Sequence, residues 1–264
     1  ILSDNLCSLL EKQLRFAFCM DVIMDENGKI MKNNDGDDHI EFKNVMIRTR
    51  NNYAYDEPRL TKERDYNILY RITKCIKYDI KDSHDVVAQW MIFMNSRCGE
   101  FMVKRKFGIF RSAIAKNTVV TNKNDDLTDE TRRVIENWKN LSGQYIVFDE
   151  NADNMRHDVL NKNNYVHMTS PIRRLVDLLN QLMFFSEFNM VQNQSSMSVN
   201  FLKKWLGKLE YINDSMRSVR KVQNDCELMT MCVKNPDIMN HKYNGVIFDK
   251  MIRNNGVITY MVYI

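Results

Sequence analysis

The sequence predicts a mixed α+β fold in which a sheet is flanked by long helices. Apolar residues recur at mostly three- and four-residue steps over residues 60–76, 86–102 and 201–229, which is the spacing of amphipathic helices. Near both ends of the chain, alternating apolar and polar residues surround asparagine-glycine turns. The sequence therefore combines helical stripes with strand pairs.

The first strand pair lies close to the N-terminus. Residues near 15–24 and 28–32 read as strands on either side of Asn27-Gly28, the strongest short-range hairpin signal. Residues 41–50 are predicted to form a third strand that carries Arg48 and Arg50 on one face, because side chains two apart point the same way.

Four further segments complete the prediction. Residues 107–112 and 143–149 read as short strands, and residues 128–140 as a helix that a Thr or Asp caps. Residues 243–264 read as strand, turn and strand. The one domain boundary that we predict lies near residue 240.

Composition is that of a folded protein of one large domain or two modest ones. The 264 residues are 44% hydrophobic, and the net charge of +4 is too small to identify a polyanion-binding protein by itself. Six cysteines form no C-x-x-C pair, and no run of eighteen apolar residues or secretion signal occurs. We therefore expect a cytoplasmic or otherwise intracellular protein in a reducing compartment, without membrane association.

Two adjacent arginines stand out in "TSPIRRLVDLLNQLMFF", residues 169–185. Ser170 is suited to cap a helix and Pro171 to occupy its first position, which places Arg173 and Arg174 in the first turn. Cations there cost about 0.3–1 kcal/mol each, because they face the positive end of the helix dipole. An anion would offset this cost.

Two interpretations of these arginines follow from spacing alone. Free backbone N–H groups and guanidinium forks together form a phosphate site. Alternatively, Arg174 pairs with a distant carboxylate, or Arg173 pairs with Asp177 one turn on. Spacing does not separate the phosphate site from the ion pair.

The string "YVHMTSPIRRLVDL" resembles the signature of the RNB domain, found in the ribonuclease II, ribonuclease R and exosome-nuclease family. The family pattern Tyr-x-His-Phe-Thr-Ser-Pro-Ile-Arg-Arg-Tyr-x-Asp is matched at Tyr165, His167, Thr169, Ser170, Pro171, Ile172, Arg173, Arg174 and Asp177. Met168 and Leu175 replace aromatic residues of the pattern.

The resemblance extends along the chain. "NLCSL" and "RFAF" are similar to a Leu-Cys-Ser-Leu segment and the strand after it, and "VMIRTRNNYAYDE" aligns Tyr55 with the family's catalytic-site tyrosine. "VVAQWMIFMNSRCGEF" and "INDSMRSVRKVQNDCEL" resemble two family helices. The resemblance thus implies a partial RNB domain over residues 1–241 and the start of a small oligonucleotide-binding barrel over residues 242–264.

The family's activity is 3′→5′ hydrolytic exoribonuclease action on single-stranded RNA, with magnesium held by aspartates. By resemblance, Arg173 contacts the scissile phosphate and Tyr55 orients the terminal nucleotide. The resemblance implies further RNA contacts from Arg174, Tyr165, His167, Thr169, Ser170, Arg48 and Arg50. Mg²⁺ is the one expected cofactor, with no small-molecule cofactor.

The sequence departs from the family in its acidic residues. The aspartate signature is expected before the Leu-Cys-Ser-Leu segment, and the chain as given does not contain it, so we predict no metal ligands here. From the missing initiator Met we expect a fragment, and from the 30 asparagines among 264 residues, a bias that A·T-rich coding produces, a viral or parasitic source. Asp35, Asp37 and Asp38 spell D-x-D-D, but we interpret them as a solvated hairpin loop.

Three glutamate positions of the family are also changed. Ala88 and Gln89 replace the Glu pair of one helix, and Gln223 replaces a Glu in another. An inactive RNB-like module that binds single-stranded RNA is therefore the alternative, and a scaffold that shares only the fold is a third reading. His39, His84 and His241 are isolated in sequence and are interpreted as surface or structural histidines.

Overall fold

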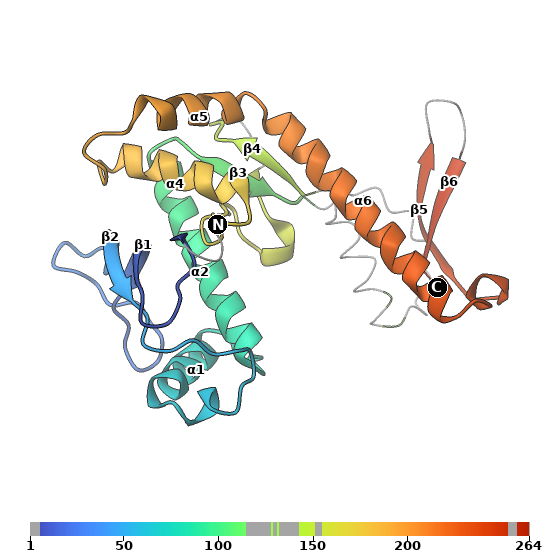
Figure 1. The fold of residues 1–264 in the computed structure, drawn as a ribbon, viewed down its shortest axis with the longest axis horizontal. Coiled ribbons are helices and arrows are strands. Elements are labelled where there is room, and N and C mark those ends of the chain that lie inside the picture. The colour runs from blue at the N-terminus through green and yellow to red at the C-terminus, as the bar shows by residue number, and fades with distance from the viewer. Residues whose placement is uncertain are drawn as a thin grey trace. The chain divides into compact units, whose positions relative to one another are not determined.

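The computed structural model describes residues 6–114, 128, 131, 143–150, 155–252 and 258–263 (Figure 1). The chain divides into two compact units. Unit 1 comprises residues 1–109 and 166–199, and unit 2 comprises residues 110–165 and 200–264. The mixed α+β prediction is confirmed, and the helix predicted over residues 128–140 lies outside the described residues apart from Thr128 and Thr131.

Unit 1 combines one β-hairpin with helices. Its elements are β1 (Leu14–Val22), β2 (Ile40–Arg48), α1 (Arg64–Ile76), α2 (Ser83–Lys104), α4 (Leu175–Glu187) and the start of α5 (Ser196–Leu206). β1 and β2 are antiparallel, with Leu14 opposite Arg48 and Val22 opposite Ile40. The predicted helices over residues 60–76 and 86–102 are confirmed as α1 and α2.

The connection between β1 and β2 corrects one strand prediction. The turn at Asn27-Gly28 is present, with Gly28 at φ +77°. Residues 28–32, however, form only isolated bridges, such as Met24 with Ile30. The Asp25 carboxylate accepts hydrogen bonds from the N–H groups of Asn27 and Lys29 at 2.9 Å, so the turn closes locally and β1 pairs with residues 40–48 instead.

An aromatic cluster joins the hairpin of unit 1 to its helices. The Phe42 ring of β2 lies 5.8 Å from Phe18 of β1, 5.1 Å from Phe101 of α2 and 5.0 Å from Phe184 of α4. Phe184 is fully buried and stacks on Phe188 at 4.4 Å. These edge-to-face and stacked contacts form the core that holds α4 in place.

Unit 2 contains the strands β4 (Gln144–Val147), β5 (Val246–Ile252) and β6 (Ile258–Tyr263), with the long helix α6 (Leu209–Lys234). β3 (Ile109–Ser112) pairs with β4, which confirms both short strands. β5 and β6 are antiparallel, with Val246 opposite Tyr263, so the predicted C-terminal strand pair is confirmed. Its membership of an oligonucleotide-binding barrel stays a prediction.

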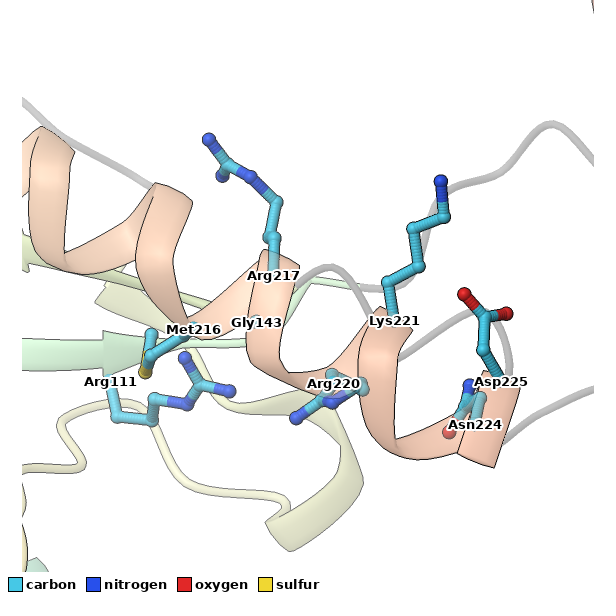
Figure 2. A pocket seen from close by; sticks show the side chains of 8 residues that line it. All are labelled: Arg111, Gly143, Met216, Arg217, Arg220, Lys221, Asn224 and Asp225. Carbon is cyan, nitrogen blue, oxygen red and sulfur yellow. The ribbon is translucent and has the colours of Figure 1, made fainter. Parts of the chain in front are cut away.

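The helix predicted over residues 201–229 is two helices. α5 ends at Leu206 and α6 begins at Leu209. Gly207 lies at the break, where glycine is a natural point of interruption because it costs about 1 kcal/mol more than alanine inside a helix. α6 and β3 border a hollow of about 310 Å³ (Figure 2).

None of the helices in the described part of the chain has the length and apolar character that a bilayer crossing requires.

Candidate functional site

The backbone of residues 166–169 is held by amide side chains of α2 and α4. Val166 and Met168 are fully buried. The Met168 N–H donates to Asn95 Oδ1 of α2 at 2.9 Å, and its carbonyl accepts from Gln181 Nε2 of α4 at 2.8 Å. Both polar groups of this buried peptide unit are therefore satisfied by side chains.

A third amide, Asn180, extends this support. Its Oδ1 accepts from the Ile109 N–H at 2.9 Å, and its Nδ2 donates to the Ile109 and His167 carbonyls at 2.9 and 3.1 Å. Asn180 has no exposed surface. These amides are not among the predicted site residues, although Asn95 and Asn180 each lie in an otherwise apolar helical stripe, which is the one signal in the sequence that points to them.

The predicted helix start at Ser170 and Pro171 is wrong. α4 begins at Leu175, and Arg174 precedes it in an extended conformation, with φ −127° and ψ 116°. The Ser170 carbonyl accepts from the N–H groups of both Arg173 and Arg174, so residues 170–173 form a turn. The arginines therefore stand just before the helix, and Asp177 occupies its first turn.

Asp177 explains this start. It is fully buried, and its Oδ1 accepts from the Ser170 N–H at 2.7 Å and from Arg174 Nη2 at 2.8 Å. Burial raises the pKa of the Asp177 carboxyl, against the opposing effect of Arg174. An acidic residue thus meets the positive end of the helix dipole, and the ion pair joins Arg174 with Asp177.

The two adjacent arginines consequently differ. Arg174 is engaged by Asp177, with only 26% of its side chain exposed. The Arg173 side chain is exposed, and no hydrogen bond or ion pair holds it in the part of the chain that the structure describes. Arg173 is the cation available to a ligand.

Three polar atoms at this corner are buried and lack hydrogen-bond partners among the described residues. They are Thr169 Oγ1, Arg174 Nε and Asp177 Oδ2. Unsatisfied buried groups cost about 1–3 kcal/mol each, so donors and acceptors grouped in this way favour a bound water or ligand group.

Tyr55 lies in a second part of unit 1, on a loop tied to the start of α2. The Asp56 N–H donates to Ser83 Oγ, while the Ser83 N–H and hydroxyl donate to Asp56 Oδ1. The Ser83 bonds lower the pKa of the Asp56 carboxyl. Tyr55 is 52% exposed and stacks on His84 with ring centroids 3.6 Å apart. His84 is therefore not an isolated histidine.

The remaining residues predicted to contact RNA differ in exposure and in their partners. Arg48 ends β2 and is exposed, whereas Arg50 lies beyond the strand and pairs with Glu63 at 3.2 Å. Tyr165 is buried, with its ring 5.3 Å from that of His157. His167 and Ser170 are half-buried. No contact between described residues joins Tyr55 to Arg173.

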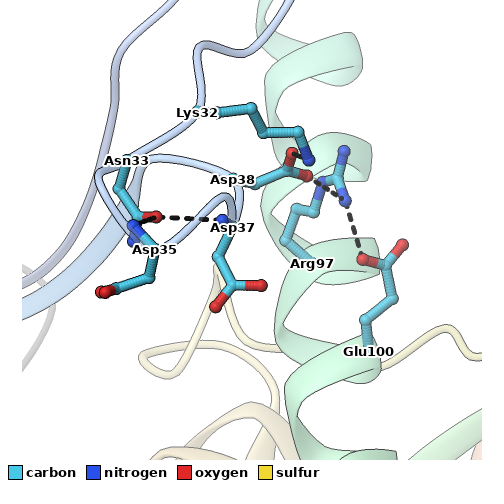
Figure 3. Close-up of polar contacts among 7 residues, drawn as sticks. All are labelled: Lys32, Asn33, Asp35, Asp37, Asp38, Arg97 and Glu100. Atoms are coloured by element: carbon cyan, nitrogen blue, oxygen red, sulfur yellow. Dashed lines mark hydrogen bonds and ion pairs between the residues drawn. The ribbon is translucent and has the colours of Figure 1, made fainter.

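The D-x-D-D segment forms a hairpin loop, as predicted. Asn33 Oδ1 accepts from the N–H groups of Asp35 and Asp37, while Asp38 pairs with Lys32 at 2.8 Å and Arg97 at 3.2 Å (Figure 3). The hydrogen bond from Lys32 lowers the pKa of the Asp38 carboxyl. Among the described residues, no three His, Cys, Asp or Glu side chains form a group able to hold a metal ion.

Comparison with known families and structures identifies the class of protein. Residues 59–186 match the model of the RNB domain. This segment contains the signature turn, α4 and the buried amides that support them. Residues 59–186 thus resemble an RNB domain, and the fold of the chain is similar to that of RNase R.

The similar solved structures include three of RNase R from Mycoplasma genitalium. The complex with double-stranded RNA has a TM-score of 0.64 at 16% identity, covering 98% of this chain and 58% of that one. The apo form and the complex with ribose-methylated single-stranded RNA each have a TM-score of 0.61 at 17% identity, covering 98% and 51%. The chain thus spans about half the length of these proteins. A comparison with curated proteins found no match.

Proposed function

We propose that this chain is the RNA-binding part of a 3′→5′ exoribonuclease that hydrolyses single-stranded RNA from its 3′ end. The RNB-domain match and the fold support a ribonuclease or RNA-binding role. The observation that carries the finer proposal is Arg173, an exposed cation on a turn whose backbone is anchored by buried side chains.

Arg173 is proposed to bind the scissile phosphate. A guanidinium presents parallel N–H donors that match phosphate oxygens, and a donor on a rigid support gains strength as charge develops on those oxygens. Asp177 positions this turn by holding the Ser170 N–H and Arg174. In this proposal Arg173 binds the RNA phosphate, whereas Arg174 stabilises the turn through Asp177. Any contact of Arg174 with RNA is secondary.

Tyr55 is proposed to stack on the terminal base. One face of its ring is covered by His84, and half of the side chain is exposed. Stacking of a base on an aromatic ring contributes about 1–3 kcal/mol and tolerates any sequence. Tyr55 with His84 would thus provide affinity without sequence preference, as an exoribonuclease requires.

The described residues do not fit the magnesium site that the family implies. Asp38 is committed to Lys32 and Arg97, and Asp35 and Asp37 lie on an exposed turn. The role proposed for the described residues is accordingly to bind and orient RNA.

A second candidate, single-stranded RNA binding without cleavage, is favoured by the residues that replace family glutamates. Ala88 is exposed on α2 and has no ionisable group. Gln223 on α6 donates to Glu227 at 3.1 Å. Substitutions of this kind remove charge from the surroundings of a hydrolytic site while the phosphate-binding turn is kept.

The two candidates are separated by one assay. The full-length protein is incubated with 3′-labelled single-stranded RNA and magnesium, and mononucleotide release is measured. We expect Arg173→Ala to lower release by about 10²–10³-fold, the usual effect of removing one transition-state donor. Arg64→Ala is the matched control, because it removes an exposed cation from α1 of the same unit.

Retention of labelled RNA without release would favour the binding module over the nuclease. Absence of both binding and release would contradict both candidates and leave a scaffold that shares only the fold. Equal losses in Arg173→Ala and Arg64→Ala would show that Arg173 has no special role.

A further inference from the structure

Charge is segregated along α6. Its central residues, 216–224, carry three cations and no acidic side chain, whereas the acidic residues stand toward the two ends of the helix, at Glu210, Asp214, Asp225 and Glu227. The three central cations are Arg217, Arg220 and Lys221, and all are exposed. Like charges three and four residues apart on a helix repel each other, which disfavours such a grouping by itself.

A fourth cation, Arg111 of β3, lies next to these residues of α6. The Arg111 guanidinium lies over the Tyr145 ring of β4, 5.1 Å from its centroid. Gly143 passes so close that an added Cβ would lie 2.5 Å from Arg111 Nη2. The backbone N–H of Arg111 donates to the Tyr165 carbonyl at 2.7 Å. The position of this guanidinium therefore depends on a glycine at 143.

The helix and the strand that carry these cations are joined directly. Asn213, one turn before Arg217, accepts from the Tyr145 N–H at 2.7 Å and donates to the Tyr145 carbonyl at 2.9 Å. Tyr145 thus holds α6 by its backbone and Arg111 by its ring. We call the four cations the basic cluster; the helix that carries three of them and the guanidinium of the fourth are held in place before any ligand binds.

The basic cluster borders the 310 Å³ hollow of unit 2. The lining contains these four cations and one carboxylate, Asp225, together with Gly143, Met216 and Asn224. The surplus of positive charge is three. The Arg217 pair with Asp214 is exposed on both sides, so water or a phosphate oxygen can replace it at little cost.

We propose that the basic cluster binds the phosphate backbone of RNA, at a site on unit 2 separate from the residues of unit 1 assigned above. This inference rests on the proposed RNA-binding function. Figure 2 shows Arg111 and Arg220 pointing toward each other between β3 and α6, while Arg217 and Lys221 project from the other side of the helix. Cations on two sides of one helix suit successive phosphates of a strand better than a single small anion.

The test measures the affinity of the full chain for fluorescently labelled single-stranded RNA as a function of KCl concentration. Arg220→Ser/Lys221→Ser removes two cations of the cluster. For single strands, each phosphate contact contributes about 0.7 to the slope of log affinity against log salt, so this variant should reduce the slope by about 1.4. Lys203→Ser/Lys204→Ser is the control, because it removes two exposed cations from α5.

An unchanged slope in Arg220→Ser/Lys221→Ser, with normal binding by the unmodified chain, would overturn this inference and leave the proposed function intact. Equal reductions in both double variants would also overturn it, since they would show a diffuse charge effect. A site for free phosphate would be shown by titration with inorganic phosphate together with unchanged RNA affinity, which again contradicts the proposal. If the unmodified chain bound no RNA, the proposed function and this inference would both fail.

Discussion

Unit 1 has two charged segments, the signature turn around Arg173 and the hairpin loop around Asp38. Both contain ion pairs between aspartate and basic side chains, but the charges are balanced to different degrees. In the loop, Asp38 finds partners in Lys32 and Arg97, and the turn closes on Asn33. In the signature turn, one carboxylate, Asp177, satisfies Arg174 and leaves Arg173 exposed.

The difference teaches which charged clusters can act as sites. The charge of Asp38 in the hairpin is balanced by two cations, Lys32 and Arg97. The charge of the signature turn is only partly balanced, and buried amides and a buried carboxylate support the turn. A rigid backbone with a surplus charge is what binding requires, because the cost of ordering is met during folding.

The largest expected effect comes from breaking the buried ion pair. Asp177→Ala should destabilise the protein by about 3–5 kcal/mol, because it leaves Arg174 and the Ser170 N–H without their partner in a buried setting. The free energy of unfolding in urea measures this. Asp214→Ala is the matched control, since Asp214 also pairs with an arginine three residues away, but both side chains are exposed to solvent. Similar losses in both variants would remove the distinction between buried and exposed charge.

A smaller effect should follow from breaking the amide support. Asn95→Leu leaves the buried Met168 N–H unpaired, which costs about 1–3 kcal/mol. Asn44→Leu is the control, because Asn44 also bonds the backbone, where it donates to the Met190 carbonyl, but its side chain is exposed. Thermal unfolding of both variants tests this. Unchanged stability of Asn95→Leu would show that the signature turn does not depend on its amides.

The smallest effect is a difference in pH dependence between two aspartates. The pKa of Asp38 is lowered below 3.8, chiefly by the Lys32 hydrogen bond, so its stabilising contribution is present above 3.8 and lost as pH falls. The pKa of Asp177 is raised above 3.8 by burial, so its folded form holds a proton more tightly than the unfolded chain. Its contribution to stability therefore declines as pH rises from 3.8 through the raised pKa.

Asp38→Asn should accordingly lessen the loss of stability on acidification, and Asp177→Asn should increase it. The free energy of unfolding, measured from neutral pH down through 3.8, gives both slopes. Changes of the same sign in the two variants would contradict the opposite pKa directions.

Much of the fold could be predicted from local pattern. The stripes over residues 60–76 and 86–102 and the short strands around Ile109 and Tyr145 all formed elements of the predicted type. The errors lie where a single residue changed a boundary. Asp25 closed a turn in place of a strand, Gly207 divided a helix, and Asp177 moved the start of α4 to Leu175.

The candidate site was predictable in its residues but not in their roles. The signature identified Arg173 and Arg174 together, because a sequence match assigns both equally. Neither Asn95 nor His84 could be assigned to the site, since their partners, Met168 and Tyr55, are far along the chain or on another element.

The sequence by itself determined the periodic elements, the RNB signature and the turn character of the acidic loop, because each depends on residues within a few positions of one another. Only the tertiary structure decided which arginine is free, what supports its turn and where a basic cluster gathers. Those outcomes depend on contacts such as Asn95 with Met168, 73 residues apart, and Tyr145 with Asn213, 68 residues apart. Packing selects such partners, and burial then sets how strongly each charge or amide is held.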